Sequence, residues 1–206
     1  MEIPVKVLEI ADGIKTMRIR GAGKIARAAA EALKIAALEY SGSRDEKSFK
    51  RHMARVADLL ISTRPTAVSL PNAVYYVMYR LLTTEDRFDE LRNTVIRAAE
   101  QFIQESIDAV RKIGEIGAKR IPGNAVVLTH CHSTAAVSVI TTAYRMGKIR
   151  KVYSTETRPF FQGRITMRHL LEAGVPAVQI PDSAVRYIMH EVDQVVVGAD
   201  TIASNG

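Results

Sequence analysis

The sequence predicts an α/β protein in which a helical N-terminal domain precedes a domain built on a parallel sheet. Apolar residues recur with a helical period from residue 5 to about residue 117. After Pro122-Gly123, short β-branched runs alternate with helical stretches instead. The chain has 206 residues, 47% hydrophobic and 25% charged, which supplies enough apolar side chains for a sizeable core.

The first half contains a series of predicted helices. One covers about residues 5–17, and an Ala-rich helix over 25–37 follows the turn at 20–23. Further helix starts are indicated by a capping box at Ser43 and Glu46, by Pro71, and by Thr84. We therefore expect a helical bundle.

The second half has a different periodicity. The predicted strands are 125–128, 151–153, 177–180 and 195–197, and the helical stretches between them are 133–146, 165–172 and 183–190. This alternation is typical of βαβ units and of a parallel sheet covered on both faces. We expect a helical domain over 1–121 and a Rossmann-like domain over 122–206, with the boundary at the Pro122-Gly123 turn.

The charge and cysteine content narrow the function classes. The 29 basic and 22 acidic residues give a net charge of +7, which favours anionic partners such as phosphorylated metabolites. We expect no nucleic-acid partner, because the sequence has no aromatic platform and no clustered basic stripe. The single cysteine, Cys131, forbids an intrachain disulfide and indicates a reducing, cytoplasmic location.

Two segments are relevant to targeting and to membrane insertion. Residues 1–10 alternate charged with apolar residues, so we expect no secretory leader. Residues 121–144 are free of Asp, Glu, Lys and Arg, but they contain Pro122, Gly123 and two histidines. We therefore expect no membrane span.

Polar residues follow each predicted strand, where ligands bind in a doubly wound sheet. Cys131 lies just before a helix that begins near Ser133, and the free amides and positive dipole of a helix start favour a thiolate. Cys131 is therefore a candidate base or nucleophile. A buried cysteine without chemistry is the alternative, because free cysteine is common in cores.

His130 and His132 flank this cysteine. The three residues together would offer zinc ligands, but consecutive residues are poorly spaced for structural zinc, and the sequence has no second ligand pair. We expect instead that the histidines tune the thiol or pack around it, and we expect no metal.

Two aspartates follow predicted strands. Asp200 comes after the apolar run 195–199, where partial desolvation suits general acid-base work. An Asx turn or a helix cap is the alternative for this residue. Asp182 precedes Ser183 and is expected to be a helix N-cap.

Three arginine segments are candidate phosphate sites. The Arg20-Gly21-Ala22-Gly23 turn precedes a helix, so its glycines permit close backbone approach and the helix start presents amides to an anion. It lacks the full dinucleotide fingerprint, and an ordinary loop-to-helix turn is the alternative. Arg64 and Arg158 each precede a proline, and arginine offers phosphate a bidentate fork, although most arginines are solvated or paired with carboxylates.

Five motifs then occur in order: RGAG at 20–23, TRPTAVSLPNA at 63–73, THCHS at 129–133, ETRP at 156–159 with Gly163, and GADTIASNG at 198–206. Together they resemble the archaeal ribose-1,5-bisphosphate isomerases over essentially the whole chain. That family belongs to a superfamily with methylthioribose-1-phosphate isomerase and the alpha, beta and delta regulatory subunits of translation initiation factor 2B. The resemblance implies a helical domain joined to a Rossmann-like domain.

The resemblance also implies residue roles, with Cys131 as the catalytic base and Asp200 as the catalytic acid. The positions that match substrate-binding residues are Arg20, Gly21, Ala22, Gly23, Arg64, Ser133, Thr134, Ala135 and Arg158. The implied reaction converts α-ribose 1,5-bisphosphate to ribulose 1,5-bisphosphate in AMP degradation, without a cofactor.

Two other functions stay open within the superfamily. Methylthioribose-1-phosphate isomerase shares the Cys and Asp logic but needs one phosphate site and an apolar pocket. A regulatory subunit would bind a phosphorylated metabolite without turnover. Regulatory subunits generally lose the cysteine, so the presence of both Cys131 and Asp200 favours an enzyme.

Members of the family that this sequence resembles continue past the position of Gly206, with a further part of the sheet and further substrate-site residues. We therefore expect a C-terminally truncated member with an incomplete sheet. The resemblance also implies a homo-oligomer, dimer or higher, that assembles through the second domain where the interface is retained.

Overall fold

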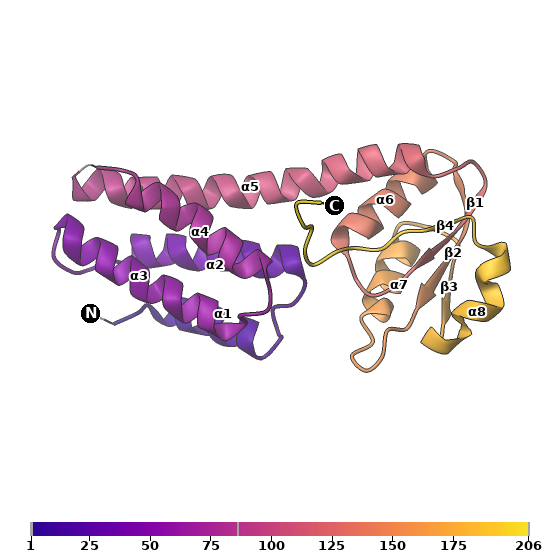
Figure 1. The fold of residues 1–206 in the computed structure, drawn as a ribbon, viewed down its shortest axis with the longest axis horizontal. Helices are drawn as coiled ribbons and strands as arrows, with labels where there is room; N and C mark the ends of the chain where they lie inside the picture. The colour runs from indigo at the N-terminus through magenta and orange to yellow at the C-terminus, as the bar shows by residue number, and fades with distance from the viewer. Residues whose placement is uncertain (1, 86, 206) are drawn as a thin grey trace. The chain divides into compact units, whose positions relative to one another are not determined.

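A computed structural model describes residues 2–85 and 87–205 of the chain. Two compact units are present: unit 1 comprises Met1–Ile107 with Asp200–Gly206, and unit 2 comprises Asp108–Ala199. The long helix α5 (Phe88–Arg120) contributes its first part to unit 1 and its last part to unit 2 (Figure 1). The predicted boundary lies at the end of this helix, and the division into domains 1–121 and 122–206 stays a prediction.

Unit 1 is a helical bundle, as the periodicity predicts. Besides the first part of α5 it contains α1 (Val5–Lys15), α2 (Ala22–Leu38), α3 (Glu46–Thr63) and α4 (Ser69–Leu82). The Ala-rich α2 packs against α1, α3 and α4. Ala29, Ala30 and Ala36 on this helix are fully buried, because their small side chains let the neighbouring helices approach closely.

Three predicted helix starts are wrong by a few residues. The N-cap of α3 is Asp45, whose carboxylate accepts the Ser48 N–H at 2.8 Å, and not Ser43. Pro71 lies within the first turn of α4, and α5 begins at Phe88 and not at Thr84. The Ser43 side chain instead bonds to the Asp45 carboxylate, so it supports the cap from outside the helix.

Unit 2 contains the predicted parallel sheet. Its strands are β1 (Ala125–Thr129), β2 (Ile149–Thr155), β3 (Ala177–Ile180) and β4 (Gln194–Val195). They pair in the order β3-β2-β1-β4, and every pairing is parallel. The fold class predicted from the sequence is therefore confirmed.

Two elements of unit 2 differ from their predicted forms. The last strand covers two residues and not three, and residues 196–205 after it form no helix or strand. The predicted helix over 183–190 is three short pieces, a 3-10 turn at Asp182–Ala184, the helix α8 (Val185–Ile188) and a second 3-10 turn at Met189–Glu191. Short helical turns therefore follow β3 in place of one regular helix.

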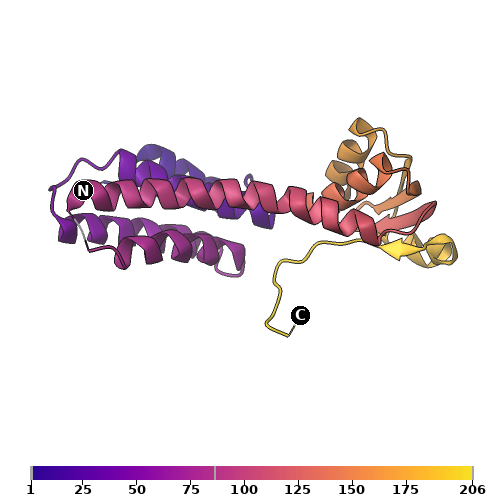
Figure 2. The same cartoon turned by 90° about the horizontal axis from the view of Figure 1, so that it is seen from above.

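Helices cover both faces of the sheet. Figure 2 shows α6 (Thr134–Arg145) and α7 (Gly163–Glu172) on one face and α8 on the other. The strand residues alternate accordingly: Val127 packs towards α6 and α7, whereas Val126 and Leu128 pack with the residues around α8. This double cover leaves the carboxyl edge as the open side of the sheet.

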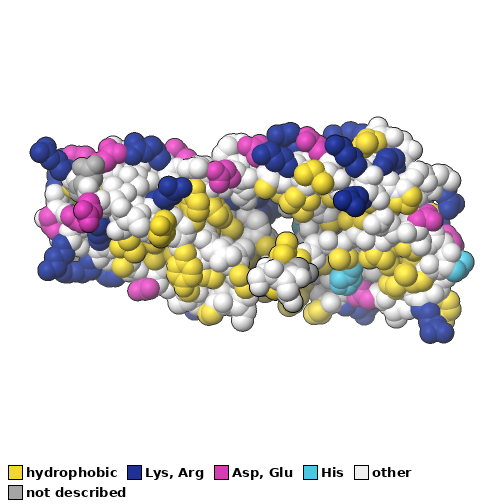
Figure 3. Space-filling model, turned by 45° about the horizontal axis from the view of Figure 1, so that its top comes forward, with side chains coloured by type: hydrophobic (Ala, Val, Ile, Leu, Met, Phe, Trp, Pro, Cys, Tyr) yellow, Lys and Arg dark blue, Asp and Glu magenta, His cyan; other side chains and the backbone are white. Residues whose placement is uncertain are grey.

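One helix of unit 1 carries exposed apolar side chains. Tyr75, Tyr79 and Leu82 lie on one face of α4 and are each about 60% exposed. Figure 3 shows hydrophobic side chains gathered over this helix. No helix in residues 2–85 and 87–205 is long and apolar enough to cross a membrane.

Candidate active site at the carboxyl edge of the sheet

Cys131 lies in the segment between β1 and α6 and is half-buried. Its φ is 65°, in the left-handed region that residues other than glycine rarely adopt. Its N–H donates to the Thr157 hydroxyl at 2.9 Å, and its carbonyl oxygen accepts from the Thr166 hydroxyl at 2.8 Å. The only thiol of the chain therefore sits on a backbone that is bonded on both sides.

The two neighbouring histidines bond to threonines. His130 Nδ1 lies 2.6 Å from the Thr155 hydroxyl, and His132 Nδ1 lies 3.0 Å from the Thr166 hydroxyl. The His132 ring also packs edge-to-face on His169. In the described part of the chain, no group of three His, Cys, Asp or Glu side chains is arranged to hold a metal ion.

Ser133 is the N-cap of α6, which agrees with the predicted helix start. Its hydroxyl accepts the Ala136 N–H at 3.2 Å, and Thr134 and Ala135 form the first turn of the helix. The amides of a first turn have no acceptor within the helix and attract anions. A Cβ atom on Gly198 would overlap the Ser133 side chain, so the chain after β4 passes directly beside this helix start.

The loop after β2 brings Arg158 to the same edge. Asp182, at the end of β3, accepts the N–H of Thr157 with one carboxylate oxygen and the N–H of Arg158 with the other, each at 2.8 Å. These bonds, first from Arg158 and then from Thr157, hold the pKa of Asp182 below its ordinary value. The predicted N-cap role of Asp182 is wrong, because its carboxylate makes no cap bond at the 3-10 turn.

A second arginine lies near Arg158. The guanidinium carbons of Arg158 and Arg164 lie 5.7 and 4.2 Å from the centre of the Phe161 ring. Arg158 is exposed and its Nε donates to Glu156 at 2.7 Å, so its two other nitrogens stay accessible for an anion. Arg164 lies in the first turn of α7 and is not among the residues predicted from the sequence.

The remaining predicted residues belong to unit 1. Gly21 is the N-cap of α2 with a φ of 92°, a conformation that favours glycine, and Ala22 begins the helix. Arg20 is half-buried beside this turn. Arg64 is half-buried at the C-cap of α3. The predicted loop-to-helix turn is therefore present, with its first-turn amides at Ala22 and Gly23.

Asp200 is exposed and lies in the irregular segment after β4. Partial desolvation was expected for it, but β4 ends at Val195, so no strand buries this carboxylate. Unit 2 thus brings together Cys131, the Ser133 turn and Arg158, whereas Asp200 is grouped with unit 1. The roles of all these residues in a substrate site stay predictions.

Three residues that hold this edge of the sheet together were not predicted as site residues from the sequence. Thr157 and Thr166 bond to the Cys131 backbone, and Asp182 holds the Arg158 turn. Their partners lie more than 20 positions away along the chain, as the separation of 24 positions between Asp182 and Arg158 illustrates. The position of Thr157 in the polar segment that follows a predicted strand was the available signal.

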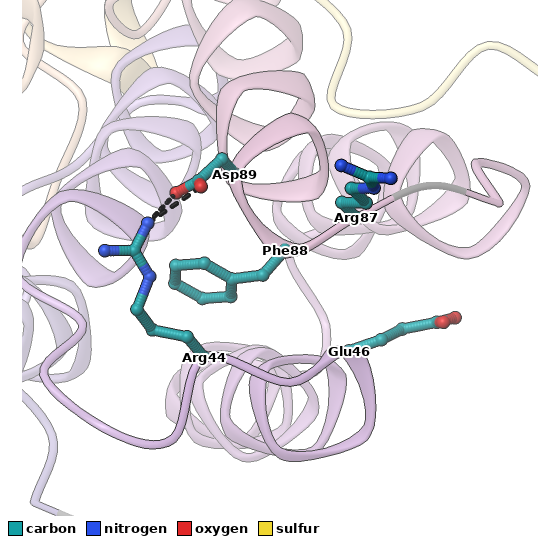
Figure 4. Close-up of a pocket in the computed structure, with 5 residues that line it drawn as sticks. All are labelled: Arg44, Glu46, Arg87, Phe88 and Asp89. Carbon is teal, nitrogen blue, oxygen red and sulfur yellow. Dashed lines mark hydrogen bonds and ion pairs between the residues drawn. The ribbon is translucent and has the colours of Figure 1, made fainter.

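A surface depression of unit 1 lies away from these residues. It measures about 670 Å3 and is lined by Arg44, Glu46, Arg87, Phe88 and Asp89 (Figure 4). That volume would admit a small molecule. However, Arg44 points to Asp89 and pairs with it at 2.6 Å, and the Glu46 side chain adds a second acidic group to the lining. None of the predicted site residues lines this depression.

Comparison with known proteins decides the family. Residues 18–206 match the model of the initiation factor 2 subunit family. The chain belongs to this family. Proteins with different named activities are similar to this chain.

Two curated relatives are named ribose 1,5-bisphosphate isomerase. The Pyrococcus furiosus protein is 51% identical over 98% of this chain, and the Thermococcus kodakarensis protein is 49% identical over the full chain. A solved structure of 5-methylthioribose 1-phosphate isomerase from Pyrococcus horikoshii is 29% identical, covers 97% of this chain and 59% of its own, and has a TM-score of 0.83. The chain spans 63% and 65% of the length of the two curated relatives.

Proposed function

We propose that this family member is an intramolecular aldose-ketose isomerase that converts α-ribose 1,5-bisphosphate to ribulose 1,5-bisphosphate. The observation that carries the proposal is the half-buried Cys131, whose backbone is held by hydrogen bonds, in the segment before the start of α6 and near the loop of Arg158. The 51% identity to a ribose 1,5-bisphosphate isomerase supports the choice of substrate. We assign the reaction to AMP degradation and the protein to the cytoplasm.

The phosphate on the anomeric oxygen determines the chemistry that is needed. It prevents formation of a free aldehyde, so ring opening and removal of the C2 proton must be coupled. In the proposal, the Cys131 thiolate takes the C2 proton, the C2–H electron pair forms the C1=C2 double bond, and the bond between C1 and the ring oxygen breaks. Asp200 gives its proton to the ring oxygen, which becomes a hydroxyl.

The second half of the reaction restores both groups. The hydroxyl on C2 of the enol gives its proton to the Asp200 carboxylate and becomes the ketone, while C1 takes the proton held by the Cys131 thiol. No atom is gained or lost, and no oxidant or metal is needed. Cys131 and Asp200 return to their starting protonation states, as a catalytic cycle requires.

Cationic and amide groups bind the two phosphates in this proposal. In unit 2 these are Arg158 and the first-turn amides after Ser133, at Thr134 and Ala135. The resemblance also makes Arg20, the backbone of Gly21, Ala22 and Gly23, and Arg64 candidate phosphate ligands. Two doubly ionised phosphates need several such donors, which accounts for the number of arginines.

The test is formation of ribulose 1,5-bisphosphate from the α-anomer, followed by phosphorus NMR. Cys131→Ser and Asp200→Asn are expected to lose about 100-fold or more in kcat, the usual contribution of a general base or acid. Asp58→Asn, at an exposed position on α3, is the matched control and is expected to keep full activity. Full turnover in Cys131→Ser would refute the role of Cys131 as base, and full turnover in Asp200→Asn would refute the role of Asp200 as acid.

The same assay separates the alternatives. It is run on this chain and on one that continues past Gly206, with methylthioribose 1-phosphate as the second substrate. Turnover of that substrate alone assigns the site to the single-phosphate reaction, and binding without turnover of either assigns a regulatory role.

We also propose that the chain forms a homo-oligomer. The support is a set of exposed apolar side chains around α8 and β4, namely Tyr187, Val195 and Val197, which are 80%, 48% and 57% exposed. Light scattering of the purified chain measures the mass, and a monomer at all concentrations would refute this part of the proposal.

A further inference from the structure

Both polar groups of the Cys131 backbone are bound by buried threonine hydroxyls. Thr157, from the loop after β2, accepts the Cys131 N–H, and Thr166, from α7, donates to the Cys131 carbonyl. The two threonines are only 7% and 1% exposed, so water does not replace either bond. Residues from two different elements therefore meet at one peptide segment.

These bonds hold a conformation that the chain would not otherwise keep. Cys131 has a φ of 65° and Thr157 a φ of 60°, and a β-branched residue in the left-handed region is an outlier. Thr157 is itself held by Asp182, which accepts its N–H at 2.8 Å. The strained backbone at Cys131 is thus fixed by its surroundings and not by its own preference.

We propose that Thr157 and Thr166 are positioning residues that fix the direction of the Cys131 thiol through its backbone. The inference rests on the proposed function, because it gives the thiol the role of the base. Neither threonine touches substrate in this account. Their hydroxyls keep the thiol directed at the reacting carbon, and a small misplacement of such a group costs much of the rate.

The substitutions that isolate the hydroxyls are Thr157→Val and Thr166→Val, which keep the side-chain shape and β-branching. Thr157→Ser and Thr166→Ser keep the hydroxyl and are expected to behave like the original chain. Thr141→Val is the matched control: Thr141 is 8% exposed, and its hydroxyl donates within α6 to the Val137 carbonyl. It reports what loss of a buried threonine hydroxyl does elsewhere in the same unit.

The first measurement is the rate at which iodoacetamide alkylates the chain, which reports on Cys131 alone because it is the only cysteine. Loss of the hydroxyl removes its bond to the Cys131 backbone and frees the half-buried thiol, so both Val variants are expected to react about fivefold faster than Thr141→Val. If a Val variant does not fold, the Ala variant replaces it with the same expectation. Val variants that react no faster than Thr141→Val would overturn the inference.

The second measurement is the kinetics of ribulose 1,5-bisphosphate formation. Both Val variants are expected to lose about tenfold or more in kcat with KM changed less than about twofold, because the thiol moves and the phosphate contacts do not. Equal losses in Thr157→Ser or Thr166→Ser would contradict a role for the hydroxyl. If the unsubstituted chain shows no turnover, the proposed function fails, and the alkylation rates still decide the positioning role.

Discussion

The carboxylate of Asp182 accepts the backbone N–H of Arg158 at 2.8 Å and thereby ties the end of β3 to the loop after β2. Its other oxygen accepts the N–H of Thr157 at the same distance. Thr157 in turn accepts the N–H of Cys131. One carboxylate therefore orients both the arginine proposed to bind phosphate and, through Thr157, the segment that carries the proposed base.

This arrangement predicts a pH-dependent contribution of Asp182 to stability. The N–H groups of Arg158 and Thr157 lower the folded-state pKa of Asp182 below its unfolded value of 3.8. The stabilisation is therefore fully present above the unfolded pKa and is lost as pH falls through the folded pKa. Asp182→Asn is expected to unfold at a lower temperature than the original chain at about pH 7, and the difference is expected to be smaller at about pH 3.

Circular dichroism of thermal unfolding at the two pH values measures this difference. Asp58→Asn, at an exposed position on α3, serves as the control and is expected to match the original chain at both. A gap for Asp182→Asn that stays equal at both pH values would show that the carboxylate charge is not the cause.

We predict that the buried side chain of His52 makes the stability of unit 1 sensitive to acid. Its side chain is 3% exposed, and the ring packs on Tyr40. Among the described residues, neither ring nitrogen has a hydrogen-bond partner. Burial, and after it the charge of Arg55, lowers the pKa of His52 below its ordinary 6.5. The unfolded chain therefore binds this proton more readily, so stability is present above pH 6.5 and is lost as pH falls through the folded pKa.

The substitution His52→Leu is expected to flatten the loss of thermal stability between about pH 7.5 and about pH 5. The same substitution at His190, whose side chain is 74% exposed, is expected to leave the slope unchanged. A His52→Leu variant that keeps the original slope would assign the acid sensitivity to other groups.

We predict that an added methyl group at Gly163 is not tolerated. A Cβ atom at this position would overlap the carbonyl oxygen of Thr155, because α7 begins directly against the end of β2. Gly163→Ala is expected to lower the free energy of unfolding by about 1–3 kcal/mol, the usual cost of overpacking. Gly123→Ala, where the added atom meets nothing within 4 Å, is the control, and equal denaturation midpoints for the two variants would refute the steric argument.

Local patterns predicted the elements of this chain well. The β-branched runs predict β1 to β3, and the start of the helix at Ser133 agrees with its observed N-cap. These features depend on a few neighbouring residues. The cap of α3 was misassigned because Ser43 and Asp45 both have the side chain of an N-cap, and only the backbone geometry selects Asp45.

Contacts between distant segments were not predictable in the same way. Asp182 was assigned to its nearest helix start, but its partners lie in the loop after β2. Thr166 looks like an ordinary helix residue in the sequence, yet its hydroxyl bonds to Cys131 from 35 residues away. The order in which strands meet decides these contacts, and the local pattern around each residue carries no information on it.

We predict that Lys148 stabilises the end of α5. Its Nζ donates to the carbonyl oxygens of Ala118, Lys119 and Ile121 at 3.1, 3.0 and 2.9 Å. The last carbonyls of a helix have no partner within it, and a cation there also interacts favourably with the helix dipole.

Lys148→Met keeps most of the aliphatic stem but removes all three donors, so it is expected to lower the free energy of unfolding by about 1–3 kcal/mol. Lys112→Met, at an exposed position on the same helix, removes the same charge away from the helix end and is expected to change little. Denaturant unfolding of the two variants provides the comparison. Equal midpoints would mean that water serves the three carbonyls as well as Lys148 does, whereas a lower midpoint in Lys148→Met alone would mean that this lysine holds the end of α5 where the chain enters β1.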